Sequence, residues 1–305
     1  MQDKSTLLAA LDQVEQLAKG TKVKRLLAHP LKYIRAILFR YLIYKQRRKP
    51  LAITTGVFFG REMKILLPAS TDIYLTGGKS HDSEIRLAKF LIKQLNPGDH
   101  FVDVGAHYGY FTLLGAALVG EKGKVVAIEA APKTFNIIEQ NTRDQKHVAV
   151  LQYALSDQAK AIDFYEFPNL YSEFNSLDKS QFEEEEWFDK MQPTKVQVPG
   201  ETLDNILKQR QINPQLIKID VEGAEYQVLQ GASATIARRT PIIMEFLAKE
   251  RGNSAHLKAT KLLLDKGYTL GRILDTGAFQ ELGSLERLMT YFQENDLDSD
   301  NIVFL

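Results

Sequence analysis

The 305-residue sequence predicts an α/β protein built on a mostly parallel, doubly wound sheet. Three observations support this fold class. From residue 100 onward, short apolar runs alternate with segments that have the length and apolar spacing of helices. The stretch 101–109, FVDVGAHYG, is typical of a strand that leads through a glycine turn into a helix. Acidic residues end several of the apolar runs, and parallel strands would bring those ends to one edge of the sheet.

The composition limits the classes of function. Hydrophobic residues make up 44% and charged residues 25% of the chain, as in ordinary soluble globular proteins. The absence of cysteine excludes disulfides, thiolate nucleophiles and cysteine-based metal sites. A net charge of +1 gives no general attraction to nucleic acid, so we expect no nucleic-acid partner. The sequence shows neither a signal-peptide core nor an apolar stretch as long as a membrane span, so we expect a cytoplasmic protein.

Residues 1–50 predict a helical N-terminal extension that is basic in its second half. Residues 5–19 have helical periodicity, with Ser5 as the expected N-cap. Residues 21–50 contain many Lys and Arg and no acid. Their apolar residues recur at helical spacing, at Leu31, Ile34, Leu38, Tyr41 and Leu42. Such a helix can make peripheral contact with an anionic membrane, or it can pack on its own domain or in a homo-oligomer. We expect packing.

The remaining elements follow in order. Residues 51–80 begin with an expected hairpin of strands 51–59 and 63–67, and a helix is expected from Asp82 to residue 95. Further strands are expected at 100–104, 124–129, 148–152, 161–167, 195–199, 215–219, 241–246 and 301–305. Further helices are expected at 109–119, 132–145, 223–231, 254–266 and 285–293.

The glycine turn suits a nucleoside ligand that carries no phosphate. Gly105 and Gly109 would let the backbone approach a ligand closely, and Glu129 at the end of the next strand can accept hydrogen bonds from a ribose diol. A dinucleotide fingerprint has a glycine where this chain has His107, whose ring would crowd a pyrophosphate. Asp103 would face an ammonium group and repel a phosphate. These residues favour S-adenosyl-L-methionine, which carries an adenosine, a sulfonium and an amino-acid tail.

Residues 215–229, QLIKIDVEGAEYQVL, add a second group of charges at the same sheet edge. A strand of buried type contains Lys218 and delivers Asp220 and Glu222 at its carboxyl end. Glu245 ends the next expected strand. Charges at such an edge are costly to bury without partners, so this group indicates a functional site.

Five sequence blocks stand in the order and at the spacing of FkbM-type methyltransferases, which this chain resembles from about Glu84 to Phe246. The blocks are VDVGAHYGYFTLL, IEAAPKTF, YALSD, IKIDVEGAEYQVLQGA and PIIMEF. The resemblance implies a Rossmann-like class I methyltransferase fold, but it does not reach the first 80 or the last 50 residues. It also implies methyl transfer from S-adenosylmethionine to an oxygen, often of a sugar, glycan or other natural product. We expect the methyltransferase domain to span residues 51–305.

The resemblance also implies roles for single residues. Those matching the cofactor-binding pattern are Asp103 and Gly105 in the turn, Glu129 at the ribose, and Ala154, Ser156 and Asp157 beside the adenine. Asp220 and Glu222 match the block that lines the methionine and acceptor side.

Transfer to an alcohol needs a base for the hydroxyl proton. Asp220, Glu222 and His107 are the candidate catalytic residues, and His107 has the ordinary pKa best suited to a base near neutrality. Two or three carboxylates would make an incomplete cage for a divalent cation, so we expect no metal.

Residues 168–194 form a long insertion, in which we expect recognition of a small-molecule or glycan acceptor. Asn175 and Ser176 could bond hydroxyl groups, and Trp187 could stack on a sugar face. A solvated lid without acceptor contacts is the other interpretation. Two further functions stay open for the whole chain: an NAD(P)-dependent oxidoreductase, and a non-catalytic cofactor-binding module that acts through its basic helix.

Overall fold

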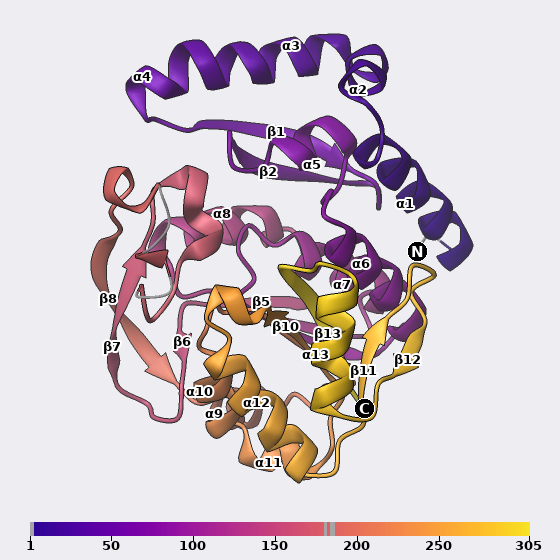
Figure 1. Ribbon diagram of the computed structural model, residues 1–305, viewed down its shortest axis with the longest axis vertical. Helices are drawn as coiled ribbons and strands as arrows, with labels where there is room; N and C mark the ends of the chain where they lie inside the picture. The colour runs from indigo at the N-terminus through magenta and orange to yellow at the C-terminus, as the bar shows by residue number, and fades with distance from the viewer. Residues whose placement is uncertain (1–2, 180–181, 184–186) are drawn as a thin grey trace.

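The computed structural model describes residues 3–179, 182–183 and 187–305 (Figure 1). Its centre is an eight-stranded sheet in the order β12-β11-β13-β10-β9-β3-β4-β5. The bounds of these strands are β3 His100–Val104, β4 Lys124–Ile128, β5 Val148–Leu151, β9 Leu216–Ile219, β10 Ile242–Leu247, β11 Leu270–Ile273, β12 Phe279–Glu281 and β13 Ser299–Phe304.

Five adjacent strands, β5-β4-β3-β9-β10, are parallel, and their order of appearance in the chain gives the 3-2-1-4-5 arrangement of doubly wound sheets. The remaining pairs, β10 with β13, β13 with β11 and β11 with β12, are antiparallel. The predicted fold class is therefore confirmed. The sequence prediction had no strands at β11 and β12, which are short.

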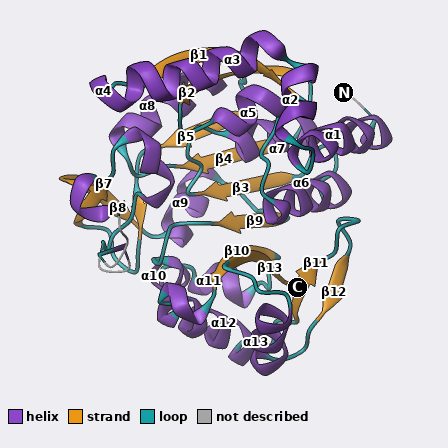
Figure 2. Cartoon of the chain, turned by 45° about the horizontal axis from the view of Figure 1, so that its top comes forward, coloured by secondary structure: helices purple, strands orange, loops and turns teal. Residues whose placement is uncertain are grey.

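Helices cover both faces of the sheet (Figure 2). Alternate strand residues face opposite sides, so Phe101 packs in one core with α1, α6 and α7, while Val102 packs in another with α9 to α13. The helices of the first face are α1 Lys4–Ala18, α6 Asp82–Gln94 and α7 Tyr110–Val119. Those of the second are α9 Leu203–Arg210, α10 Glu225–Gln230, α11 Ser233–Ala237, α12 Ser254–Asp265 and α13 Leu285–Glu294.

Helix α1 belongs to the core, because Leu7, Leu11 and Val14 are buried against α6 and its surroundings. The predicted N-cap of α1, Ser5, is wrong. The N-cap of α1 is Asp3, whose carboxylate accepts the backbone N–H of Ser5, and the N-cap of α6 is His81, which makes no side-chain capping bond.

A thin outer layer lies beyond the sheet, at the top of Figure 1. It consists of the predicted hairpin, β1 Leu51–Val57 with β2 Arg61–Leu67, and of the helical run that covers it. That run comprises α2 Lys22–Ala28, α3 Pro30–Leu38, η1 Phe39–Tyr44 and α4 Lys45–Arg47. Helices α5 Thr71–Thr76 and α8 Pro132–Thr142 pack beneath the hairpin.

The apolar stripe of this outer run does not pack on the chain. Ala36, Phe39 and Tyr44 make the buried side of the run. The stripe residues Leu31, Ile34, Leu38, Tyr41 and Leu42 are all exposed. Packing of this stripe on its own domain, one of the two forms of the packing prediction, is therefore wrong, and packing in a homo-oligomer stays a prediction.

A smaller sheet, β6-β8-β7, flanks the carboxyl edge of the large one. Its strands are β6 Ala154–Leu155, β7 Ala161–Glu166 and β8 Thr194–Glu201. Between β7 and β8 runs the predicted insertion, whose described residues include the short helices η2 Asn169–Phe174 and η4 Phe188–Lys190. A further short helix, η5 Lys249–Arg251, follows β10.

Candidate functional site

A cavity of about 360 Å³ opens at the carboxyl ends of β3, β4, β9 and β10, where doubly wound sheets bind ligands. Its volume lies in the range of small-molecule sites. Apolar walls come from Val104, Phe111, Ile128, Tyr153, Leu155 and Phe164. Of the residues predicted for the site, Gly105, His107, Glu129, Ala154, Asn175, Asp220 and Glu222 line it. The structure therefore brings these residues together around one cavity, and their roles stay predictions.

The two predicted glycines have different structural roles. Gly105 lines the cavity with a φ of +74°, and a Cβ on it would lie 1.7 Å from the carbonyl oxygen of Asp220. Gly105 therefore allows β3 and β9 to close on each other at the floor of the site. Gly109 has a φ of +89°, a Cβ on it would lie 2.8 Å from the side chain of Ile138 of α8, and it is not among the described residues that line the cavity.

Asp103 lies below the cavity and holds the sheet together. It is a neighbour of Lys218 in the β3–β9 register, and the two side chains form a buried ion pair of 3.4 Å. Its other carboxylate oxygen accepts a hydrogen bond of 2.6 Å from Thr112 of α7. In the part of the chain that the structure describes, Asp103 does not line the cavity, so it does not face a ligand ammonium as the sequence analysis expected.

Lys218 links the two predicted clusters. Its ammonium lies 3.1 Å from the carboxylate of Asp220 and 3.4 Å from the carbonyl oxygen of Gly105. Burial alone would lower the pKa of Lys218, but the carboxylates of Asp220 and Asp103 outweigh burial and raise it. Lys218 is therefore a buried cation that fixes Asp220 at the cavity floor.

Glu129 follows β4 and is buried at the cavity wall. Its carboxylate accepts the backbone N–H groups of His107 at 2.8 Å and Ala131 at 2.9 Å. Burial raises the pKa of Glu129 to about 7, although both amides oppose that shift. Each oxygen can accept a second hydrogen bond, which suits a ligand with two adjacent hydroxyls.

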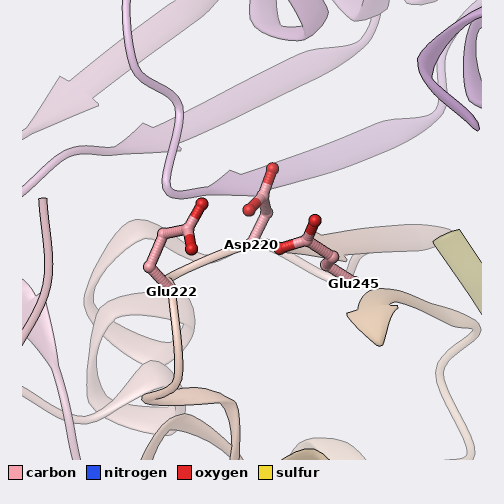
Figure 3. Close-up of side chains that lie close together, drawn as sticks. All are labelled: Asp220, Glu222 and Glu245. Carbon is pink, nitrogen blue, oxygen red and sulfur yellow. The ribbon is translucent and has the colours of Figure 1, made fainter. Parts of the chain in front are cut away.

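Three carboxylates that line the cavity lie close together (Figure 3). One oxygen from each of Asp220, Glu222 and Glu245 lies within 4.8 Å of the others. Oxygen ligands at this spacing suit a divalent cation, although a full shell would need further ligands. The three carboxylates could equally well take up protons or share them with one another. Glu245 was noted in the sequence as an acid at this edge but not as a site residue.

Glu225 shapes the loop that brings Glu222 into this group. Its carboxylate accepts the backbone N–H groups of Val221 at 3.1 Å and Gly223 at 3.4 Å, and it lies 3.2 Å from His256. Glu222 stands between Val221 and Gly223 in this loop and has a φ of +52°. Glu225 is therefore a positioning residue, whose partners could not be deduced from its place at a helix start.

Crowding of the acids changes their proton affinity. Burial, followed by the charges of Glu245 and Asp220, raises the pKa of Glu222. Burial, followed by Asp220, raises the pKa of Glu245 to about 8. Glu245 therefore exchanges its proton near neutral pH, and Glu222 beside it holds its proton more tightly than an exposed glutamate does.

His107 lines the cavity but is a poor base. Burial lowers its pKa to about 4, and its Nε2 is 3.0 Å from the hydroxyl of Ser172. Its ring also lies 3.8 Å from that of Tyr108. The ordinary pKa of histidine, which made His107 a candidate base, does not apply here, because the turn and the insertion enclose the imidazole.

The predicted acceptor residues have different surroundings. Asn175 lines the cavity, while its side chain accepts the backbone N–H of Phe167. Ser176 is fully buried and donates to the carbonyl oxygen of Asp178. Trp187 stacks on Tyr171, with ring centroids 4.2 Å apart. Among the described residues, Ser176 and Trp187 do not line the cavity, so both support the insertion rather than face a ligand.

The segment predicted to lie beside the adenine reaches the cavity at Ala154. Ser156 bonds its own loop through the carbonyl oxygen of Gln158, and Asp157 is exposed. Neither lines the cavity in the described chain. The cavity thus has an apolar wall near Ala154 and the carboxylate of Glu129, which could accept hydrogen bonds from the two hydroxyls of a diol. Its acidic floor suits a ligand with positive charge, which is the chemistry of S-adenosylmethionine.

The sequence analysis missed an ion-pair group at the rim. Lys79 lines the cavity and lies 2.8 Å from Glu84 and 3.1 Å from Glu173. Arg251 also lines the cavity. The sequence GGKS before α6 was the one signal for Lys79, since a glycine pair beside a charged residue is typical of a shaped loop.

A family model described as the methyltransferase FkbM domain matches residues 103–270, more than half of the chain. No curated protein matches the sequence. Solved structures with similar folds include the Aeropyrum pernix fibrillarin bound to S-adenosyl-L-methionine. It is 13% identical, with a TM-score of 0.37 and coverage of 72% of this chain and 74% of that one. A Bacillus cereus O-methyltransferase in complex with SAH is 13% identical, with a TM-score of 0.39 and coverage of 72% and 79%. Scores of this size are too low to bear on the activity of this chain.

Proposed function

The chain belongs to the FkbM methyltransferase family, with S-adenosylmethionine as its cofactor, and we propose that it methylates a hydroxyl oxygen of a sugar, glycan or natural-product acceptor. Family membership removes the NAD(P)-dependent oxidoreductase from consideration. The observation that carries the proposal is the cavity itself, which has a diol acceptor on one wall and three carboxylates on its floor.

The cofactor, when bound, supplies a methyl group on a positively charged sulfur, and transfer to an alcohol oxygen leaves a neutral thioether and one proton. We assign the ribose hydroxyls to Glu129, because its buried carboxylate retains accepting capacity. Gly105 and Ala154 line the same cavity as that carboxylate, and their small size leaves room for a ligand. The carboxylates around Asp220 would stabilise a cationic group of the ligand, because opposite charges attract most strongly at short distance.

The chain needs an acceptor for the hydroxyl proton, and Glu222 with Glu245 is the best candidate. Both pKa values are raised, so an ionised carboxylate here is a stronger base than an exposed one. Asp220 is held by Lys218 and orients the acceptor hydroxyl. His107 forms part of the wall as a neutral imidazole and takes no proton.

The insertion excludes water and shapes the acceptor side. Ser172, Glu173, Phe174 and Asn175 line the cavity from this segment. An aromatic ring beside amide and carboxylate groups suits a hydroxyl-rich ring, because sugars present apolar faces between polar edges. The size of the cavity favours presentation of a single residue of a larger acceptor.

The test is transfer of radiolabelled methyl from S-adenosylmethionine to a panel of sugars, glycans and phenolic or aliphatic alcohols. We expect product that carries the label on oxygen, and loss of turnover with retained cofactor binding in Glu222→Gln. Asp157→Asn is the matched control, since Asp157 is exposed and away from the cavity. Label on nitrogen or carbon, or a Glu222→Gln variant with full turnover, would contradict the proposal. Activity that disappears with a chelator and returns with Mg²⁺ would assign the carboxylates to a metal instead.

A further inference from the structure

We propose that the outer face of residues 22–44 docks the protein on an anionic lipid bilayer. Ten large apolar side chains are exposed in the described part of the chain, and nine of them lie between residues 23 and 43. The most exposed are Leu27 at 77% and Leu31 at 83%. Apolar surface gathered in one place marks a site of interaction, whereas scattered exposed residues are ordinary.

These side chains form one face of the helical run. Within α3, Leu31, Ile34 and Leu38 follow one another at steps of three and four residues, which brings them to one side of that helix. Leu27 of α2 precedes them, and Tyr41 and Leu42 of η1 follow them in the same outer run. Ala36 and Phe39 point the other way and are buried toward the body of the protein. Figure 1 shows the run at the outer edge of the molecule, over the β1–β2 hairpin. The apolar face therefore lies on the outside.

The same run carries a large positive charge. Residues 21–50 contain ten Lys and Arg and no Asp or Glu, although the whole chain has a net charge of only +1. Among the described residues, none of these ten cations lies within 4 Å of a carboxylate. Lys32 instead bonds the hydroxyl of Thr55, and Arg25 the carbonyl oxygen of Gly20. The positive charge of these ten side chains is therefore available to a partner outside the chain.

An anionic bilayer fits both properties at once. A basic amphipathic helix lies in the plane of the membrane with its apolar side chains among the acyl chains and its cations at the headgroups. A second copy of this chain fits less well, because a two-fold interface would bring the same uncompensated cations together. Nucleic acid would use the cations but leave Leu27, Leu31 and Ile34 exposed to water. No described helix is long and apolar enough to cross a membrane.

The test is co-sedimentation of the full chain with vesicles of phosphatidylcholine containing 30% phosphatidylserine, and with phosphatidylcholine alone. We expect binding to the anionic vesicles at low salt and a fall of about tenfold or more at high salt, because screening weakens surface attraction. Leu27→Ser with Leu31→Ser should lose binding at low salt. Arg35→Gln with Arg40→Gln should lose it as well.

Matched controls lie elsewhere on the surface. Leu305→Ser replaces the tenth exposed apolar residue, at 41% exposure, and Lys122→Gln with Lys146→Gln removes two exposed cations. Both should bind vesicles as the parent chain does. The proposal is overturned if the parent does not sediment with anionic vesicles, or if the leucine variant still binds them. It is also overturned if sedimentation velocity shows a dimer that the leucine variant breaks while vesicle binding is absent.

Discussion

At the carboxyl edge of the sheet, Asp103, Glu129 and Lys218 are buried, whereas in the N-terminal layer Leu27 and Leu31 are more than three-quarters exposed. Charged side chains are usually exposed and large apolar side chains are usually buried, so both regions depart from the usual pattern of burial, in opposite directions. The buried charges are compensated inside the chain by ion pairs and backbone amides. The exposed leucines have no such compensation within the described chain.

This difference separates two kinds of site. A compensated group of buried charges is part of the folded state, so its disruption should affect stability and chemistry together. An uncompensated apolar face contributes little to the folded monomer, so its disruption should spare stability and affect only association. The predictions below test whether the two regions divide in this way.

The largest expected effect comes from Lys218→Met. Removal of the ammonium leaves Asp103 buried without its ion-pair partner, and loss of one member of a buried pair costs about 3–5 kcal/mol of unfolding free energy. Urea denaturation followed by circular dichroism measures this loss. Lys195→Met, which breaks the exposed pair with Asp163, should change little. Equal effects of the two variants would show that burial does not distinguish the sites.

A second effect concerns turnover and its pH dependence. Glu245 must be ionised to accept a proton, and its pKa is about 8, so kcat/KM should fall as the pH drops below about 8. In Glu245→Gln, turnover should drop by about 10²-fold or more and the dependence on this pH range should flatten. Assays from pH 6 to 9 with saturating cofactor measure both. A variant that keeps the parent's pH profile would place the titrating group elsewhere.

Much of this architecture could be read from local patterns. The alternation of strands and helices predicts the parallel sheet, and its carboxyl edge brings Gly105, Glu129, Asp220 and Glu222 to one cavity as expected. Side-chain direction is harder to predict. Asp103 stands beside the glycine turn in sequence, but the register with Lys218 turns its carboxylate into the sheet.

What the sequence could not reveal depends on contacts between distant segments. The low pKa of His107 results from enclosure by the insertion, and the rim pair of Lys79 with Glu173 joins residues 94 positions apart. The packing of Trp187 on Tyr171 also depends on the folded insertion. The apolar stripe of the N-terminal run was visible in the sequence, but periodicity does not say which face a neighbouring element covers.

A third, smaller effect concerns the cofactor. Glu129→Gln should weaken binding of S-adenosylhomocysteine by about 1–3 kcal/mol, the loss expected for a charged hydrogen-bond acceptor. Because the pKa of Glu129 is about 7, the affinity of the parent should decrease as the pH falls below 7. Calorimetric titration between pH 5.5 and 8.5 measures both. Glu166→Gln is the control, since Glu166 is equally buried and accepts the backbone N–H of Lys133 outside the cavity. Equal losses in the two variants would contradict the ribose assignment.

The smallest expected effect is the change in unfolding free energy when a leucine of the outer layer is replaced. It is best measured by comparison with the same replacement of a leucine in the core. Leu11 of α1 is fully buried, so Leu11→Ala should cost about 2–5 kcal/mol of unfolding free energy through the cavity it leaves. Leu31 is 83% exposed, and Leu31→Ala should change that free energy by no more than about 0.5 kcal/mol, since alanine also suits a helix. Denaturant midpoints of both variants, measured on monomeric protein without lipid, give the comparison. A large loss in Leu31→Ala would mean that its face is covered within the protein, and it would contradict the distinction between a buried, compensated region and an uncompensated apolar face.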